Sequence, residues 1–546
     1  MYLEGYPSMN NYFSTSNDIN NSRPLDVHVW SDYPEFNQLV NKLWVKYFPS
    51  EDSTIRPGPK SKATSKIHFK TLLLDLYVCW MTDPNMYLGV HMSNSGWKAN
   101  SRYNALHLSY RMIGIIKELV AEDVLEFQKG RQGTLSRIRA TEQLQLLFRD
   151  LKFPVSEVVF DYLRDPIILR GMSEEPDEME VQNSNKKLKK PTLEYDDTPE
   201  TTRMRGVLNK YNELLNKNSL DVFSLEESYF ERIEKKVGKE EKNVRHYITG
   251  RNHFVRRIFN NGSWGLGGRF YGGWWQQISK ELRPDIMIND KPVVEIDFTA
   301  MHIALLQAQV AEKPELDPVS VKDIETQKKS DLFQKFNASR LIGMDEIPNA
   351  DDDPYTLNKS IFPSKNDFDQ RKAVKQLILK AINAKSRNSA FSAFRSRQAT
   401  GDPLKKMKNI ELSKLLDAFI EKHPELEPFL CTGKGLELMY LDSRIAESVI
   451  EQLTEKSIPV LCVHDSFIVV HDKKNELLRA MELACSQVIG RNIGSDYTKQ
   501  SHADWFEESN RTRKTPKWRL KKIARCEGYL RRMGLNPYDE FHEWIS

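Results

Sequence analysis

The stretch Pro292-Val-Val-Glu-Ile-Asp297 reads as a short apolar strand that ends in an aspartate. The polar pair Asn289-Asp290 precedes it and is typical of a hairpin turn. An apolar run over 301–311 follows it directly and favours a helix. The sequence therefore predicts a strand that leads into a helix, with Asp297 at the junction.

A second stretch, Ile458-Pro-Val-Leu-Cys-Val-His-Asp-Ser-Phe-Ile-Val-Val470, contains two apolar segments around a polar triplet. This pattern predicts a β-hairpin with Asp465 at its bend. An ionised aspartate in apolar surroundings is costly unless it is paired or bound to a metal. Two strands that bring Asp297 and Asp465 to one sheet edge would offer oxygen ligands suited to Mg²⁺. Taken alone, either aspartate is more often a turn or cap residue.

Between these stretches lies Arg371-Lys-Ala-Val-Lys375, the start of a segment without helix breakers that continues to Asn383. A helix places Arg371 and Lys375 on one face, at i and i+4, so both cations can reach one triphosphate. Leu377 and Ile378 would then face the core. The alternative is an ordinary helix with a basic outer face, which is commoner for this spacing taken alone.

Length and composition exclude several classes of protein. The chain has 546 residues, of which 39% are hydrophobic and 29% are charged, so we expect about three globular domains. No apolar run approaches the ~18 residues that a membrane span needs, and the start of the chain lacks the pattern of a signal peptide. The five cysteines are scattered, without a Cys-x-x-Cys pair. We expect a cytoplasmic protein with no membrane partner.

The N-terminal part is expected to bind DNA. Residues 1–30 are rich in Asn, Ser and Tyr, and we expect them to be poorly ordered. Over 31–170 the pattern is mostly helical and ends with a basic hairpin and its flanking segment. This order is typical of a winged-helix-like DNA-binding domain. Arg131 in the hairpin turn and Arg137 on its second strand would contact phosphates. The alternative is a helical subdomain with an ordinary hairpin.

Two charged segments complete the organisation of the chain. Residues 171–202 contain opposed blocks of acidic and basic residues with few large apolar ones, which predicts a flexible linker and a domain boundary. Between Arg511 and Arg532 there are ten Lys or Arg and one acid, Glu527. Such a stretch can neutralise phosphates, although a solvated basic helix or tail fits it equally well.

Together, the three segments around Asp297, Arg371 and Asp465 resemble the ordered A, B and C motifs of family A DNA polymerases and of the related phage-type single-subunit RNA polymerases. Upstream, Gly267-Gly-Arg-Phe270 and Gln276-Gln-Ile278 are similar to the family's Gly-Arg segment, whose arginine touches the primer–template minor groove. The resemblance covers roughly residues 245–500.

The resemblance implies an α+β right-hand polymerase with palm, fingers and thumb, carrying the winged-helix-like domain at its N-terminus. The regions that it implies are a thumb-like helical region at 203–261, the first part of the palm at 262–306, the fingers at 307–400, and the second part of the palm with a basic C-terminal region at 401–546.

The resemblance also implies roles for individual residues. Asp297 and Asp465 would be the catalytic carboxylates and would hold two Mg²⁺ ions. The nucleotide would contact Arg371, Lys375, His302, Leu379 and Asn383, and the primer–template would contact Arg269, Gln276, Gln277 and His464.

Four positions depart from the DNA polymerase pattern. Asn383 stands where the family has the Tyr of its second motif, and Leu379 is aliphatic, as in the RNA enzymes. Ser466 follows the second aspartate, also as in the RNA enzymes. His302 replaces the Glu with which the DNA enzymes obstruct a ribose 2′-OH, and the RNA enzymes have Gly there. The choice between dNTPs and NTPs therefore stays open.

The leading interpretation is a template-directed nucleotidyltransferase, a DNA polymerase that acts in DNA replication. The appended DNA-binding domain would suit replication of a mobile element. Its partners would be a DNA primer–template and nucleoside triphosphates, and no segment suggests a proofreading exonuclease. One alternative is a single-subunit RNA polymerase or a primase-like enzyme. Another is a non-catalytic DNA-binding replication factor.

Overall fold

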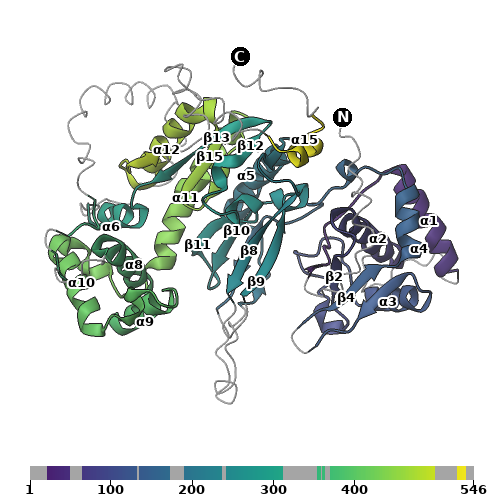
Figure 1. The fold of residues 1–546 in the computed structure, drawn as a ribbon, viewed down its shortest axis with the longest axis horizontal. Coiled ribbons are helices and arrows are strands. Elements are labelled where there is room, and N and C mark those ends of the chain that lie inside the picture. The colour runs from purple at the N-terminus through teal and green to yellow at the C-terminus, as the bar shows by residue number, and fades with distance from the viewer. Residues whose placement is uncertain are drawn as a thin grey trace.

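The computed structural model describes residues 21–49, 64–131, 134–172, 190–235, 241–311, 353–357, 360–362, 369–497 and 525–535. The fold is of the α+β class, as expected (Figure 1). Two large hydrophobic cores are present, one in the N-terminal domain and one shared by the rest of the molecule. No helix within the described ranges is both long and apolar enough to cross a membrane.

The N-terminal domain packs helices on one small sheet. Its helices are α1 (Pro34–Tyr47), α2 (Ser65–Thr82), α3 (Arg111–Ala121) and α4 (Glu142–Asp150). Helix α2 begins where the Thr64 side chain accepts a hydrogen bond from the Ile67 backbone N–H. It buries residues on all sides, because α1, α3 and the sheet all contact it. In α3 the apolar residues Met112, Ile115, Ile116 and Leu119 recur at helical spacing and are buried.

The sheet of this domain has the strand order β1 (Ser22–Pro24), β2 (Tyr87–Val90), β4 (Ser136–Ala140) and β3 (Leu125–Gln128). Strands β3 and β4 form the antiparallel hairpin that the sequence predicted. The expectation of a poorly ordered N-terminus is wrong for residues 21–30. Strand β1 pairs in parallel with β2, and Val29 is fully buried, so backbone pairing and apolar burial order a segment of polar composition.

A second, central sheet has the order β11 (Ser263–Tyr271), β10 (Arg256–Asn260), β5 (Ile167–Arg170) and β6 (Thr192–Leu193). Strand β5 pairs in parallel with β10, and β6 pairs with β5. Both assignments made for this part of the chain therefore need correction. Residues 167–170 belong to the central sheet and not to the N-terminal domain, and 190–202 are folded, whereas 173–189 lie outside the described residues.

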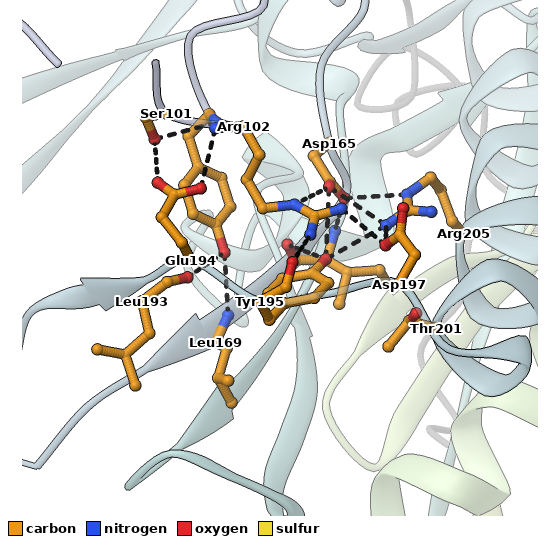
Figure 2. A network of polar contacts seen from close by, with 12 residues as sticks. Ser101, Arg102, Asp165, Leu169, Leu193, Glu194, Tyr195, Asp197, Thr201 and Arg205 are labelled. Atoms are coloured by element: carbon orange, nitrogen blue, oxygen red, sulfur yellow. Dashed lines mark hydrogen bonds and ion pairs between the residues drawn. The ribbon is translucent and has the colours of Figure 1, made fainter. Parts of the chain in front are cut away.

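Polar contacts join the N-terminal domain to the segment that was expected to be a linker (Figure 2). Arg102 donates to Asp165 at 2.8 Å and to Asp197 at 2.8 Å, and its guanidinium lies 3.5 Å from the centre of the Tyr195 ring. Arg205 donates to the same Asp197 at 2.6 Å. These contacts cross the expected boundary, so the two parts of the chain are packed together there.

The region 203–261, expected to be helical and thumb-like, contains one helix followed by strands. It begins with helix α5 (Pro199–Asn216), which the Thr198 side chain caps. Strands β7 (Leu220–Val222), β8 (Tyr229–Lys235) and β9 (Glu241–Tyr247) then follow, and β8 pairs with β9 in a separate hairpin. The helical expectation is therefore wrong after residue 216.

The third sheet carries the two aspartates. Its order is β14 (Leu461–Val463), β15 (Ser466–Val470), β13 (Lys291–Phe298), β12 (Ile286–Ile288) and β7, and β16 (Ser495–Tyr497) also pairs with β13. The turn between β12 and β13 is Asn289-Asp290, both with positive φ, which suits these two residue types in a tight hairpin. The hairpin of β14 and β15 is also present as predicted.

Helices cover these sheets on several sides (Figure 1). Helix α11 (Gly435–Glu455) contacts β11 of the central sheet, α6 (Met301–Ala311) and α12 (Lys474–Ile489), and α12 contacts β15. Three further helices, α8 (Gln370–Asn383), α9 (Arg387–Ser396) and α10 (Asn409–Lys422), pack on one another at one side of the molecule. Helix α8 is the basic helix that the sequence predicted.

A row of polar side chains fixes α11 against the central sheet. Arg257 of β10 is buried, and it pairs with Glu447 at 2.8 Å and donates to Ser443 at 3.1 Å. Gly268 of β11 has φ +79°, and a Cβ at this position would approach the Ser443 Oγ to 2.8 Å. Only glycine allows this close approach with that backbone conformation.

The described end of the basic C-terminal stretch is held by the fold. In this part, helix α15 (Glu527–Met533) packs near β7 and β12. Arg532 pairs with Asp221 at 2.9 Å, and Arg525 pairs with Asp290. These two arginines are thus engaged within the protein, and residues 511–524 lie outside the described ranges.

Candidate active site

Asp297 lies on β13 of the third sheet, and Asp465 lies in the turn just before the adjacent strand β15. In the antiparallel pairing of β13 with β15, Asp297 is opposite Ser466, the residue directly after Asp465. The backbone N–H of Phe298 donates to the backbone carbonyl of Asp465 at 3.3 Å. The two aspartates, 168 positions apart in the sequence, are therefore brought to the same place by strand pairing.

Charges of both signs act on Asp297, with Asp465 and Glu295 as the acids and Lys375 and Lys280 as the cations. Loss of hydration beside the surrounding protein, followed by the negative charges of Asp465 and Glu295, raises the pKa of Asp297 to about 7. The Asp297 side chain is nevertheless exposed at the surface. Glu295 accepts a hydrogen bond from Ser466 at 2.7 Å and pairs with Arg283 at 2.7 Å. A cation at this edge would relieve the repulsion between the two aspartates.

The donor set fits Mg²⁺, which proteins often hold through one or two carboxylates while substrate phosphates and water complete the shell. Within the described residues, no three His, Cys, Asp or Glu side chains cluster at metal-ligand spacing. Asp297 and Asp465 thus offer part of such a shell. Sequence reasoning missed Asp496 of β16, which the register places directly opposite Asp297 on its other side.

Lys375 and Arg371 project from α8 and differ in their contacts. The charge of Lys375 acts directly on Asp297, whose pKa it lowers, and its Nζ lies 5.8 Å from the Tyr355 ring centre. Arg371 is held by Asp353 through two hydrogen bonds of 2.9 and 2.7 Å. Lys375 is therefore the cation of this pair whose charge acts on Asp297, and Arg371 is already paired with Asp353.

Leu379 and Asn383 follow on the C-terminal half of α8. Leu379 is half-buried, and Asn383 is exposed and donates from its side chain to the Leu379 carbonyl at 2.8 Å. A Cβ on Gly435, the first residue of α11, would collide with the Asn383 side-chain oxygen. The departure from the polymerase pattern at Asn383 thus coincides with a close contact between α8 and α11.

Arg269, which the resemblance implies would contact the primer–template, is engaged within the protein. It forms a two-pronged ion pair with Asp442 of α11, with Nε 3.1 and 2.9 Å from the two carboxylate oxygens. His302 Nε2 lies 3.2 Å from Arg269 Nη2 and 3.5 Å from Asp442. Sequence reasoning missed Asp442, although an aspartate amid the apolar pattern of a helix is a usable signal.

The two glutamines of the Gly-Arg segment have different surroundings. The Gln276 side chain donates to the backbone carbonyls of Phe270 and Cys462, both at 3.0 Å, so it ties β11 to β14. Gln277 is exposed and accepts a hydrogen bond from Arg232 at 3.0 Å. Gln276 therefore has a structural role, and Gln277 is accessible.

His464 occupies the bend between β14 and β15 with φ +60°. Its ring packs edge-on against Tyr271 at 5.6 Å. Burial, followed by the charge of Arg269, lowers the pKa of His464. Its Nδ1 is buried and has no hydrogen-bond partner among the described residues.

The two arginines of the N-terminal hairpin lie apart from this site. Arg131 is exposed at the turn between β3 and β4. Arg137 is half-buried on β4, and its guanidinium donates to the Leu135 carbonyl. Figure 1 places β4 on the opposite side of the view from β13 and β15. The structure thus brings together Asp297, Asp465 and Lys375, and separately Arg269 with His302.

Comparison with models of known protein families gives no match, and comparison with curated protein sequences gives none either. The geometry of the site is therefore the basis for any statement about function.

Proposed function

We propose that the protein is a template-directed nucleotidyltransferase of the family A polymerase type that extends a DNA primer with the help of Mg²⁺. One observation carries the proposal. Asp297 on β13 lies beside Asp465, in the turn that leads into the paired strand β15, and the charge of Lys375 on α8 acts on Asp297. Carboxylates beside a cation suit a triphosphate that carries Mg²⁺.

In this proposal the third sheet, with α11 and α12 behind it, is the palm, and α8 to α10 are the fingers. The aspartates then lie at the edge of the palm, and Lys375 extends from the fingers toward them. No thumb is assigned to 203–261, because that region is mainly strand beyond α5.

Each side chain of the site would have its own role in nucleotide addition. Asp297 and Asp465 would hold two Mg²⁺ ions, which activate the attacking oxygen and stabilise the leaving pyrophosphate when bound. Lys375 would bind the triphosphate and offset the charge that develops on it. The ion pair of Arg269 with Asp442 would position the imidazole of His302 near the incoming sugar.

The N-terminal domain would add contacts to the DNA backbone. Arg131 is exposed in the hairpin turn, where a winged-helix-like domain would meet phosphates. Arg139, two residues after Arg137 on β4, is paired with Glu126 at 2.7 Å. The proposal therefore gives Arg139 no role in binding DNA.

Primer extension with purified full-length protein tests the proposal. Wild-type protein with Mg²⁺ is expected to extend a primed DNA template, and Asp297→Asn and Asp465→Asn are expected to abolish extension while DNA binding persists. Asp472→Asn is the matched control, because Asp472 is exposed and pairs only weakly with Lys291 at 3.5 Å. Near-wild-type extension by both site variants would show that the palm assignment is wrong.

The same assay distinguishes the alternatives. Parallel reactions with NTPs and with RNA templates would identify an RNA polymerase or primase-like enzyme. A protein that binds DNA but incorporates no nucleotide under any of these conditions would be a non-catalytic replication factor.

A further inference from the structure

A cavity of about 480 Å³ lies between the N-terminal domain and the central sheet. The N-terminal domain contributes Gly89 and Leu135 to its lining, and the central sheet contributes Ile168 of β5 and Arg256 of β10. None of the residues assigned above to the palm or fingers lines it. The cavity is therefore a separate feature, and its volume is that of a typical small-molecule site.

Positive charge gathers on one side of this cavity. Among the described residues, Arg256 has no hydrogen-bond or ion-pair partner, and its buried Nε is unsatisfied. Burial, followed by the charge of Arg164, which also lines the cavity, lowers the pKa of the Arg256 guanidinium to about 10. Asp26 lies 3.9 Å from Arg164, at the limit of an ion pair. An unpaired, half-buried arginine is costly unless an anion joins it.

The other polar residues of the lining also favour an anionic ligand. Lys98 is exposed and lines the cavity. His28 is 7% exposed, and its Nδ1 has no hydrogen-bond partner among the described residues. Burial, with the charge of Arg164 as the next cause, lowers the pKa of His28 to about 4, so the ring is neutral near pH 7. A neutral imidazole carries one ring N–H, which can donate a hydrogen bond to an anion.

The two acids in the lining, Asp165 and Glu194, already accept hydrogen bonds from other residues of the protein (Figure 2). Asp165 accepts from Arg102 at 2.8 Å and from Arg205 at 3.4 Å. Glu194 accepts from the Ser101 hydroxyl at 2.6 Å and from the Arg102 backbone N–H at 3.0 Å. Arg102 and Arg205 offset the charge of Asp165, whereas Glu194, among the described residues, accepts only from neutral groups and keeps its charge. The cations that line the cavity are Arg256, Arg164 and Lys98.

We propose that this cavity binds a phosphate-bearing small molecule of about the size of a mononucleotide, with its phosphate at Arg256 and Arg164. Arginine is the side chain best shaped to bind a phosphate through two parallel hydrogen bonds. A bare phosphate would leave most of the cavity empty. The rings of Trp97 and Tyr103 and the side chain of Ile168, all in the lining, supply the apolar surface that an organic group needs.

The site would act without a metal, which separates it from the proposed palm. Its charges are cationic, so a phosphate needs no Mg²⁺ to bind there, whereas the aspartates repel a triphosphate unless Mg²⁺ is present. Binding of a nucleoside monophosphate in EDTA would thus report on the cavity alone, whatever primer extension shows.

Isothermal titration of the full-length protein in EDTA, with dAMP as the probe, tests the proposal. We expect wild-type protein to bind dAMP and Arg256→Met to bind it at least roughly tenfold more weakly, since a charge-assisted contact is lost. The urea midpoint of ligand-free Arg256→Met should not fall, because the variant removes an unpaired charge. Arg479→Gln is the control, because Arg479 is exposed on α12 and should leave binding unchanged.

Two further measurements secure the result. Lys98→Ala, at an exposed position that carries no risk to folding, should also weaken dAMP binding, and deoxyadenosine, which lacks the phosphate, should bind much more weakly than dAMP. The proposal is overturned if wild-type protein does not bind dAMP. It is also overturned if Arg256→Met and Lys98→Ala bind dAMP as tightly as wild type, or if deoxyadenosine binds as tightly as dAMP.

Discussion

Arg269 and Asp442 form an ion pair that joins β11 to α11 across 173 positions of sequence. The Asp442 side chain is 2% exposed and that of Arg269 is 14% exposed, and His302 contacts both. The pair therefore connects the central sheet to the helix that follows Asp297. Its energetics and its effect on His302 can be tested separately.

Asp442→Ala should destabilise the protein by about 3–5 kcal/mol, because it leaves the Arg269 charge buried without a partner. The double variant Arg269→Met/Asp442→Leu should lose less than Asp442→Ala alone, since both charges are removed together. Urea unfolding of the two variants and of wild type measures this difference. Equal losses in the single and double variants would mean that solvent reaches Arg269 well enough to replace its partner.

His302→Gly should raise the use of NTPs relative to dNTPs by roughly tenfold or more, because it removes a bulky ring beside the incoming sugar. The ring is 14% exposed and fixed by Arg269 and Asp442, so it cannot easily turn away. The measurement is kcat/KM for dCTP and CTP in both proteins. If wild type already prefers CTP, the RNA polymerase interpretation takes precedence, and an unchanged ratio would exclude His302 as the sugar gate.

Lys375→Ala should lower kcat/KM for dNTPs by roughly 10²–10³-fold, since it removes a cation from the charge that develops on the phosphates. Arg371→Ala should have a smaller effect, because Asp353 already binds that guanidinium. Lys372→Ala, an exposed neighbour on α8, provides the matched control and should leave kcat/KM unchanged. A larger loss from Arg371→Ala than from Lys375→Ala would reverse the roles that we assign to them.

A fragment of residues 171–546 should be less stable and less soluble than one of residues 165–546. The shorter fragment lacks β5, which pairs with both β10 and β6 in the central sheet, and it exposes the edge of β10. Expression followed by limited proteolysis compares the two fragments. If both are equally resistant, β5 contributes little to the sheet, and the domain boundary that was expected near residue 171 is adequate.

Stability should fall as the pH is lowered below about 6.5, in part through His253. Burial lowers the pKa of His253 from 6.5 to about 4, so between these values the unfolded chain binds a proton that the folded chain does not. The contribution is fully present above pH 6.5 and is lost as the pH falls toward 4. Between about pH 7.5 and about pH 5.5, wild type should lose about 1.4 kcal/mol more than His253→Phe, measured by urea unfolding. Equal losses would show that the folded state protonates His253 normally.

Local features of the fold were predictable from the sequence. The turn at Asn289-Asp290, the hairpin around Asp465 and the helix that carries Lys375 depend on patterns within about 15 neighbouring residues. The same patterns identified the aspartates, because an acid that ends an apolar strand is conspicuous. Their pairing across β13 and β15 followed from the expectation that two such strands share a sheet.

Long-range partners were not predictable in the same way. Strand β5 is short and resembles many apolar runs, so nothing in its own residues selects β10 as its neighbour. The engagement of Arg269 depends on Asp442, and that of Arg371 on Asp353, and neither acid lies within the motif that drew attention to the arginine. Polar composition likewise predicted disorder at 21–30 and at 190–202, where strand pairing and arginine contacts order the chain.

The polar row on α11 determines how this helix can move. An apolar helix face tolerates sliding along its neighbour, because one aliphatic side chain can replace another at little cost. Asp442, Ser443 and Glu447 meet Arg269 and Arg257 within about one and a half turns of the helix, so translation by even one turn would break three polar contacts at once. Helix α11 is thus fixed against the central sheet, and any displacement of that sheet moves the imidazole of His302 with it.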